Sequence, residues 1–148
     1  MKRRRSRPVP ARPSATAEAE GWPDWLQQEL ADSLRNGCVG RQIVMENVRA
    51  RIWRARLEPN ERMAFHCHTL DYCWIALSDG VLQSRHASGR IDRYDLADGT
   101  VYFQRVPKDE PRVRDLENVG NAALGFMVVE FLDSANPPLP VPNHVRLR

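Results

Sequence analysis

Apolar and polar residues alternate in short runs from about residue 39 to residue 133, and turn-forming residues separate the runs. Alternation with a period of two is typical of half-buried β-strands, because successive side chains of a strand point to opposite faces. The turn signals are Glu46-Asn47, Pro59-Asn60, Asp79-Gly80, Ser88-Gly89, Asp98-Gly99 and Gly120-Asn121. Strands separated by turns at this spacing predict an all-β sandwich or barrel over residues 38–134.

One segment has a helical period instead. Its apolar residues at helical spacing are Trp25, Leu26, Leu30 and Leu34. Pro23 stands at the start of this run and Gly37 at its end, where these residue types commonly begin and end helices. The sequence therefore predicts one N-terminal helix within residues 21–37, which we expect to act as a lid or to pack in a dimer.

The two ends of the chain differ in composition from the part between them. Residues 1–20 are rich in Arg, Pro, Ala and Ser, which leaves almost nothing to bury and predicts a disordered basic leader. Residues 135–148 carry four prolines, and proline cannot donate a hydrogen bond to a sheet. We therefore expect a Pro-rich, extended C-terminal tail.

The positive net charge of the chain comes from these ends. The whole chain carries 22 basic and 19 acidic residues, whereas residues 21–140 carry 14 basic and 17 acidic ones. A mildly acidic body gives no support for a nucleic-acid-binding face on the domain. Binding to nucleic acid or to an acidic surface would rest on the N-terminal arginines alone.

The chain also lacks the sequence signals of membrane insertion and secretion. No apolar run approaches the length that crosses a bilayer, and the Arg-rich start is not followed by the apolar stretch of a secretory signal. The three cysteines have no paired spacing, which argues against a disulfide framework and fits a reducing compartment. We expect a cytoplasmic protein with no membrane or nucleic-acid partner.

The segment from Val48 to Leu57 contains a change of phase. Apolar residues occupy the even positions up to Ile52 and the odd positions from Trp53 onward. Such a change predicts a β-bulge at Ile52-Trp53. The intervening arginines are Arg49, Arg51, Arg54 and Arg56. We interpret them as a solvated face, with an anion-binding stripe as the alternative.

The most informative motif is His66-Cys67-His68. In a strand the two histidines share one face, so they could offer two imidazoles to a single ion while Cys67 points the other way. A first-row metal site normally needs three or four ligands. The motif alone is therefore an incomplete metal site.

The surroundings of this motif resemble the cupin superfamily, whose two motifs read G-x5-H-x-H-x3-4-E-x6-G and G-x5-P-x-G-x2-H-x3-N. The matching residues here are His66, His68 and Gly80 in the first motif, and Gly99 and Asn118 in the second. The resemblance looks closest to the small cupins associated with β-alanine degradation. It implies a jelly-roll barrel, also called a double-stranded β-helix, with the histidines inside it and a divalent transition metal (Fe, Zn, Ni, Cu or Mn) as cofactor.

Two ligand positions of the cupin motifs differ in this chain. Cys73 stands where the glutamate falls, and Arg114 stands where the histidine of the second motif falls. Cys73 would be either a small buried hydrophobe or a third metal ligand, and two imidazoles with one thiolate favour Zn or Cu. Asp71 would complete a two-histidine, one-carboxylate set only through a bulge, because its parity in a regular strand is opposite to that of the histidines.

Arg114 cannot replace a histidine ligand. A guanidinium has no lone pair, and its fixed positive charge repels a divalent cation. In a mostly apolar barrel it would instead hold a carboxylate or phosphate bidentately, with Arg112 as a second contact. The alternative is a register shift across the preceding loop, which would point Arg114 to solvent or pair it with Asp115 or Glu117.

Two further residues are weaker candidates. Tyr72 could act as a general acid near the mouth of the pocket, although an aromatic residue on such a strand usually packs. We interpret His86 as a surface histidine, with a third-ligand role as the alternative.

Two functional classes follow from these residues. The first is a metal-dependent cupin enzyme, a dioxygenase, isomerase or lyase that acts on a small carboxylate-bearing molecule. The second is a metal-poor cupin that binds a small anion as a sensor, carrier or accessory protein. For either class we expect a homodimer formed through the helix or the edge strands.

Overall fold

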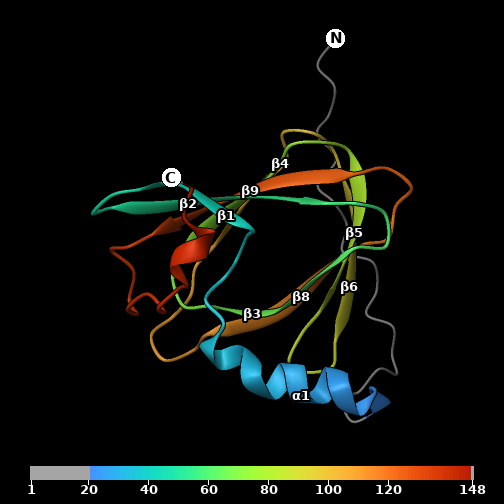
Figure 1. Ribbon diagram of the computed structural model, residues 1–148, viewed down its shortest axis with the longest axis horizontal. Helices are drawn as coiled ribbons and strands as arrows, with labels where there is room; N and C mark the ends of the chain where they lie inside the picture. The colour runs from blue at the N-terminus through green and yellow to red at the C-terminus, as the bar shows by residue number, and fades with distance from the viewer. Residues whose placement is uncertain (1–20, 148) are drawn as a thin grey trace.

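The computed structural model describes residues 21–147, which form two antiparallel β-sheets packed face to face with a helix beneath them (Figure 1). The predicted disordered leader, residues 1–20, lies outside the described residues. The architecture confirms the prediction of an all-β domain with one N-terminal helix.

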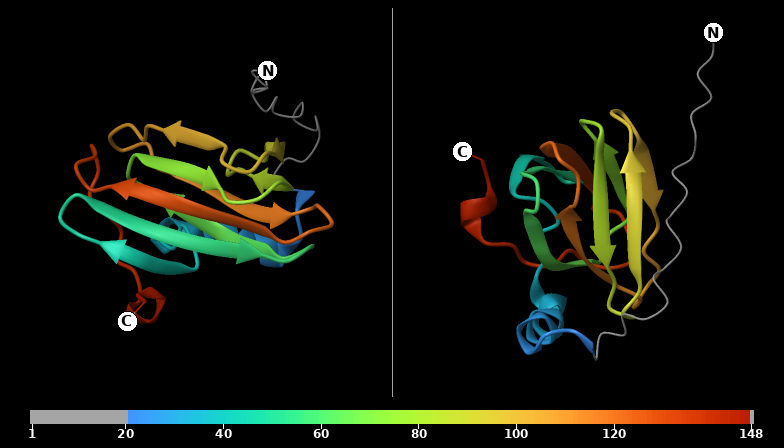
Figure 2. Two further views of the ribbon diagram at one scale, coloured as in Figure 1. Left: turned by 90° about the horizontal axis from the view of Figure 1, so that it is seen from above. Right: turned by 90° about the vertical axis from the view of Figure 1, so that its right-hand side faces the viewer.

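One sheet has five strands in the order β1-β2-β9-β4-β7, and the other has four in the order β3-β8-β5-β6. The strands are β1 (Gln42–Glu46), β2 (Ala50–Leu57), β3 (Arg62–His68), β4 (Tyr72–Ala76), β5 (Gly80–Arg85), β6 (Ile91–Leu96), β7 (Val101–Gln104), β8 (Arg112–Asn118) and β9 (Leu124–Phe131). Figure 2 shows the five-stranded sheet face-on in its left panel and strands β5 and β6 in the foreground of its right panel. Most sheet neighbours are far apart in sequence, as in a jelly roll.

The core fills the space between the two sheets. Alternate residues of β9 are buried, so that Leu124, Phe126 and Val128 face inward. Phe126 stacks on Trp74 of β4 at a ring-centroid distance of 4.7 Å. Each fully buried side chain of this size contributes about 1.5–3 kcal/mol through the hydrophobic effect, so this inner layer is the main source of stability.

Strand β2 corrects the predicted bulge. It pairs with β9 without a register shift from Ala50 to Leu57, and the irregularity lies in the neighbouring strand β1, between Ile43 and Met45. The pattern was misleading because Arg51 faces inward together with Trp53, at a position where an apolar residue is expected.

Arg51 is therefore not part of a solvated face, unlike the exposed Arg49, Arg54 and Arg56. Its guanidinium Nε donates to Oε1 of the buried Glu130 at 3.0 Å, and the indole Nε1 of Trp53 donates to the same oxygen. The positive charge is satisfied inside the domain, which is the condition for burying an ion pair at a tolerable cost.

Helix α1 (Asp24–Asp32) continues into a 3-10 turn at Ser33–Arg35. It packs on the outer face of the four-stranded sheet, where Trp22 stacks on Phe65 at 5.7 Å and Leu26 joins the same apolar cluster. The helix covers its own sheet from outside, which corrects the expectation of a lid. This cover explains why β3 is buried on both faces near its end.

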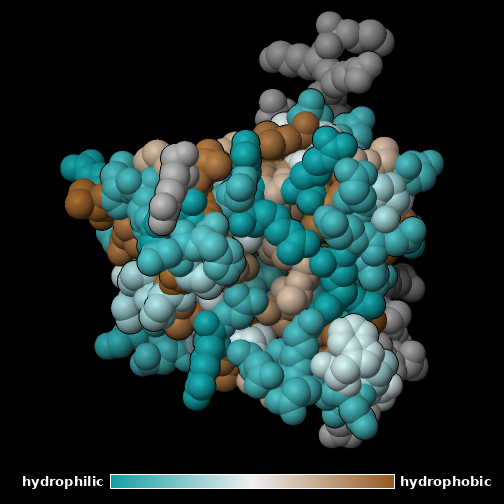
Figure 3. Space-filling view, in the orientation of Figure 1, coloured by the Kyte–Doolittle hydropathy of each residue, from teal (hydrophilic) through white to brown (hydrophobic). Residues whose placement is uncertain are grey.

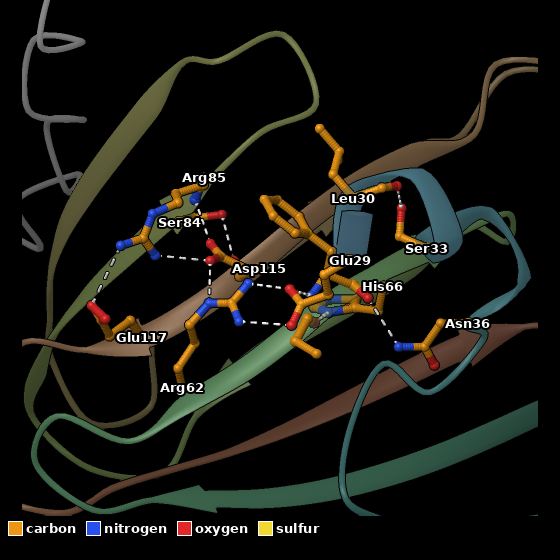
Figure 4. Close-up of polar contacts among 12 residues, drawn as sticks. Glu29, Leu30, Ser33, Asn36, Arg62, His66, Ser84, Arg85, Asp115 and Glu117 are labelled. Carbon is orange, nitrogen blue, oxygen red and sulfur yellow. Dashed lines mark hydrogen bonds and ion pairs between the residues drawn. The ribbon is translucent and has the colours of Figure 1, made fainter. Parts of the chain in front are cut away.

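An ionic network fastens the helix to the sheet (Figure 4). The guanidinium of Arg62 pairs with both carboxylate oxygens of Glu29 on α1, and its Nε donates to Oδ2 of Asp115 on β8 at 2.6 Å. Asp115 is fully buried and also accepts from the side chain of Arg85 at 2.8 Å. Each charge of this network therefore has an opposite partner.

The C-terminal tail runs along the surface of its own chain. Asn136 donates from Nδ2 to the carbonyls of Thr69 and Pro107, and Leu147 N donates to Ile43 O. A short 3-10 turn, Asn143–Val145, buries Val145 against the core. Within residues 21–147, the only helices are too short and too polar to span a bilayer.

Candidate functional site

A bulge in β3 places the two histidines of the H-x-H motif inside the barrel. Met63 pairs with Leu116, but the next pair is His66 with Arg114, so β3 has one extra residue between them. An extra residue exchanges the faces of all side chains beyond it. His66 and His68 consequently face the interior, and Phe65 faces the helix.

His66 and His68 are both buried, with exposed fractions of 0% and 1%. Their rings meet edge to face at a centroid distance of 5.0 Å. Nδ1 of His66 lies 2.9 Å from the carbonyl of Ala64, which places its proton there and leaves the Nε2 lone pair free. Among residues 21–147, His66 Nε2 and both ring nitrogens of His68 have no hydrogen-bond partner.

The histidines are electrically neutral at neutral pH. Burial lowers the pKa of His66 to about 3, with a further lowering from the positive charge of Arg114. Burial also holds the pKa of His68 well below its ordinary value, and His66 and Arg114 add to the effect. Each imidazole can therefore accept a hydrogen bond or donate one, but it carries no charge.

Arg114 lies directly across the β3–β8 ladder from His66, and an isolated bridge pairs it with His86 on its other side. Directly opposed residues of an antiparallel pair share a face, so Arg114 points into the barrel. This register excludes the alternative in which a register shift points Arg114 to solvent. Asp115 and Glu117, its suggested partners, belong instead to the ion pairs of Arg85 on the outer face.

The guanidinium of Arg114 has no acidic partner within the described chain. Its Cζ lies 5.8 Å from the ring centroid of Tyr72, and its Nε is buried without an acceptor. The buried Arg51, by contrast, meets the carboxylate of Glu130. A half-buried guanidinium without a counter-ion is a binding group for an anion.

Cys73 does not join the histidines. It alternates with the buried Tyr72 and Trp74 on β4 and pairs with Val129 and Phe103, so its side chain lies on the outer face of the five-stranded sheet. This placement corrects the expectation that Cys73 could complete a metal site. Asp71 does not replace it, since Oδ1 of Asp71 accepts from Val106 N at 2.7 Å.

The residues present therefore do not fit a cupin metal centre. Nowhere in residues 21–147 do three or more His, Cys, Asp or Glu side chains gather in a group that could hold a metal ion. Two imidazoles remain, and the position opposite them carries the fixed positive charge of Arg114. His86, the alternative third ligand, places Nε2 2.9 Å from Oδ2 of Asp92.

A cavity of about 130 Å³ lies next to Arg114 between the two sheets. Its lining consists of Tyr72, Trp74, Leu82, Tyr94, Leu96, Tyr102, Phe103, Gln104 and Arg114. The volume is close to that of the cavity of about 150 Å³ that accommodates benzene in another protein. The walls are mostly aromatic and aliphatic, and Arg114 is the one charged residue among them.

The cavity wall also carries hydrogen-bond donors without protein acceptors. Nε1 of Trp74, the hydroxyl of Tyr102 and Nε of Arg114 are buried and unpartnered among the described residues. An indole and a guanidinium can only donate. Their convergence on one cavity favours a ligand with acceptor oxygens.

The structure brings together some of the expected site residues and separates others. Tyr72 lines the cavity and stacks on His68 at a centroid distance of 3.9 Å, so it connects the cavity to the histidines. Arg112 lies opposite His68 but is exposed and outside the cavity lining. Whether Tyr72 acts as a general acid stays a prediction.

Sequence reasoning missed the contribution of β6 and β7. Tyr94 donates to Oδ2 of Asp92 at 3.2 Å, and Arg90 also reaches this carboxylate, at 3.0 Å. Burial raises the pKa of Tyr94 to about 12, so its hydroxyl keeps its proton. Tyr94 and Tyr102 lie on alternating positions of short strands, a signal that predicts an inward face but not a cavity.

No protein-family model matches the sequence, and no curated protein matches it. A cupin domain from Bordetella pertussis Tohama I is similar in structure, with a TM-score of 0.54 and 21% identity over 61% of this chain and 88% of that one. A protein with a double-stranded β-helix domain from Klebsiella pneumoniae is also similar in structure. Its TM-score is 0.52 and its sequence identity 18%, over 72% of this chain and 90% of that one.

An RmlC-like cupin from Methanocaldococcus jannaschii is similar as well, with a TM-score of 0.50 and 18% identity over 67% of this chain and 79% of that one. These likenesses show that the chain has the cupin fold, which the H-x-H motif indicated. At such identities they show the fold alone, because one fold serves many functions. The narrower likeness to the β-alanine-degradation type stays a prediction.

Proposed function

We propose that this protein binds a small organic carboxylate between its two sheets without a metal ion. The observation that carries the proposal is Arg114, a guanidinium that faces the cavity without an acidic partner among residues 21–147. It supplies the positive charge at a position where a metal ligand was expected. Of the two functional classes derived from the sequence, the site therefore supports the metal-poor binding protein.

The cavity favours a ligand with an apolar body and one acidic group. Aromatic and leucine side chains form most of its wall, and these residues bind apolar ligand atoms. Arg114, Trp74 and Tyr102 supply donors for the carboxylate oxygens. A volume of about 130 Å³ limits the body to roughly the size of one six-membered ring.

Such a site suits a sensor, a carrier or an accessory protein of small-molecule metabolism. The neutral His66 and His68 lie behind Tyr72 and can hold its ring in place through the stacking of His68. None of these groups is arranged as a nucleophile with its base. Binding, rather than turnover, is the function that the site supports best.

The test uses the full-length chain after treatment with a chelator, and benzoate as the probe. Binding is measured by calorimetry and by quenching of tryptophan fluorescence, with benzyl alcohol as the neutral probe of similar size. We expect benzoate to bind and benzyl alcohol to bind at least tenfold more weakly, since a charged hydrogen bond contributes about 1.5–3 kcal/mol.

Arg114→Met should abolish this preference for the carboxylate, and Arg93→Met, a change at an exposed position of β6, should preserve it. The proposal fails if Arg114→Met and the unchanged protein bind benzoate equally. It also fails if the chain contains stoichiometric metal that a His66→Ala, His68→Ala double variant loses, because that result supports the metal-dependent enzyme.

A further inference from the structure

The outer face of the five-stranded sheet is apolar over three neighbouring strands. We define the apolar face by Cys73 and Ile75 of β4, Val101 and Phe103 of β7, and Met127 and Val129 of β9. These side chains alternate with buried ones on β4 and β9 and with half-buried ones on β7, and so point away from the core. Phe103 is 63% exposed and Val101 56%.

The register of the strands makes this apolar face continuous. Cys73 lies between Phe103 and Val129 in one row, and Ile75 lies between Val101 and Met127 in the next. The first row continues through Ile52 of β2. The row then ends at Met45 on β1, which is 42% exposed. One row of apolar side chains therefore crosses the whole sheet.

The outer face of the four-stranded sheet differs from this apolar face. It is covered by α1 and carries the ionic network of Arg62, Asp115 and Arg85 (Figure 4). The left panel of Figure 2 shows that α1 lies on the far side of the five-stranded sheet. In Figure 3 this sheet lies along the upper border and is seen edge-on, with brown apolar atoms interspersed among teal polar ones. An antiparallel sheet that faces water normally has a polar outer side.

From this contrast we infer that two copies of the chain associate through the apolar face. Strands lie about 4.8 Å apart and alternate residues about 7 Å apart, so the apolar rows extend over roughly 20 by 15 Å. That is the size of the apolar centre of a standard interface, which buries about 800 Å² per partner with its polar rim.

The charges at the borders of the face fit a second copy of the same chain. Arg54 and Arg56 project from β2 at one border. Asp79 and Asp98 lie at the opposite border, in the turns next to β4 and β7, where Asp98 N donates to Asp79 Oδ1. A two-fold axis parallel to the strands brings β2 of one copy over β7 of the other. Each arginine pair then meets an aspartate pair, and the contact is self-complementary.

Strand β7 connects this surface to the cavity. It pairs with β4 alone in its sheet. Val101 belongs to the apolar face, Tyr102 and Gln104 line the cavity, and Phe103 contributes to both. A second copy packed on β7 would hold this edge strand in place. Dimerisation is therefore expected to strengthen ligand binding, although the dimer itself does not depend on the proposed ligand.

The test is the molar mass of the full-length chain in solution, by light scattering and by sedimentation over a wide range of concentration. We expect twice the chain mass of 17.0 kDa for the unchanged protein. The double variant Val101→Lys, Phe103→Lys should be monomeric, with an unchanged circular dichroism spectrum. Trp25→Lys, at a 62% exposed position of α1, should remain dimeric.

A charge exchange tests the orientation of the two copies. Arg56→Asp should weaken the dimer at least tenfold, Asp98→Arg should do the same, and the two changes together should restore it. A monomer at every concentration would overturn the inference. So would a dimer that survives Val101→Lys, Phe103→Lys and dissociates with Trp25→Lys, because the helix would then be the interface.

Discussion

Arg114 and His66 face each other across the β3–β8 ladder, with both side chains on the inner face of the sheet. This relationship places a fixed positive charge beside a neutral imidazole, in a layer where the cupin motifs would place a third histidine. The repulsion between a guanidinium and a divalent cation argues against a metal ion at this position.

The first prediction concerns this pair. Arg114→His would give three imidazoles on one face, namely His66, His68 and the new side chain, without the opposing charge. We expect the variant to bind Zn or Co near one equivalent, whereas the unchanged protein binds none at stoichiometric level. Metal analysis and the visible spectrum of Co measure the result.

The control for this gain of metal binding adds His66→Ala to Arg114→His, which should remove the metal again. Equal metal content in the unchanged protein and the Arg114→His variant would contradict the prediction. Because the apolar face lies on the other sheet, the molar mass should be the same in all these variants.

The second prediction is a loss of stability in acid. Burial lowers the pKa of His66 to about 3 in the folded protein. Between about pH 6.5 and pH 3, His66 is therefore protonated in the unfolded chain but stays neutral in the folded protein. Stability therefore falls as the pH is lowered through this window, by up to about 1.4 kcal/mol per pH unit for each such histidine. His68 adds to the slope because its pKa is lowered in the same direction.

Urea unfolding at a series of pH values measures this dependence. Replacing both residues, as His66→Gln and His68→Gln, should flatten the curve between pH 7 and pH 4. His144→Gln, at an exposed position of the tail, should leave the slope as it is. If stability depends on pH in the same way in the double variant and the unchanged protein, His66 and His68 are not the cause of the loss in acid.

The third prediction concerns the network beneath α1. Asp115→Ala leaves Arg62 and Arg85 without their shared, fully buried carboxylate, and we expect a loss of about 3–5 kcal/mol in the free energy of unfolding. Glu29→Ala removes the contact on the helix side only, and should chiefly increase hydrogen exchange in α1. Glu58→Ala, which breaks the exposed pair with Arg56, should cost less than about 1 kcal/mol.

The fourth prediction concerns the buried pair of Arg51 and Glu130. Arg51→Met leaves the carboxylate of Glu130 buried without its cation, so we expect a loss of about 3–5 kcal/mol at neutral pH. Burial already raises the pKa of Glu130, and removal of the positive charge raises it further. Glu130 of the folded variant then takes up a proton more readily than Glu130 of the unfolded chain. The loss in free energy of unfolding, relative to the unchanged protein, should therefore become smaller as the pH falls.

Unfolding of the Arg51→Met variant at neutral and mildly acidic pH tests this direction. Arg49→Met, at an exposed position two residues before Arg51, is the control and should behave as the unchanged protein. If the loss of stability became larger in acid, Glu130 would not be the group that determines the pH dependence of the variant.

The sequence by itself determined the class of fold and the fact that His66 and His68 share one face of a strand. Period-two alternation, turn residues and the spacing around His66 and His68 are local properties, because a strand exposes alternate residues to the same side. The helix was predictable for the same reason, because its apolar residues recur within a few positions. Pro23 directly precedes α1 as expected, whereas α1 ends at Asp32 and its 3-10 turn at Arg35, before Gly37.

Only the tertiary structure decided the composition of the site. Arg51 faces the core because Glu130, far away in sequence, provides its partner, and local alternation could not reveal this. Arg114 and Cys73 both stand at ligand positions of the cupin motifs, but the first points into the barrel and the second points out of it. Strand pairing and bulges set these directions, and both depend on contacts between segments that are distant in the chain.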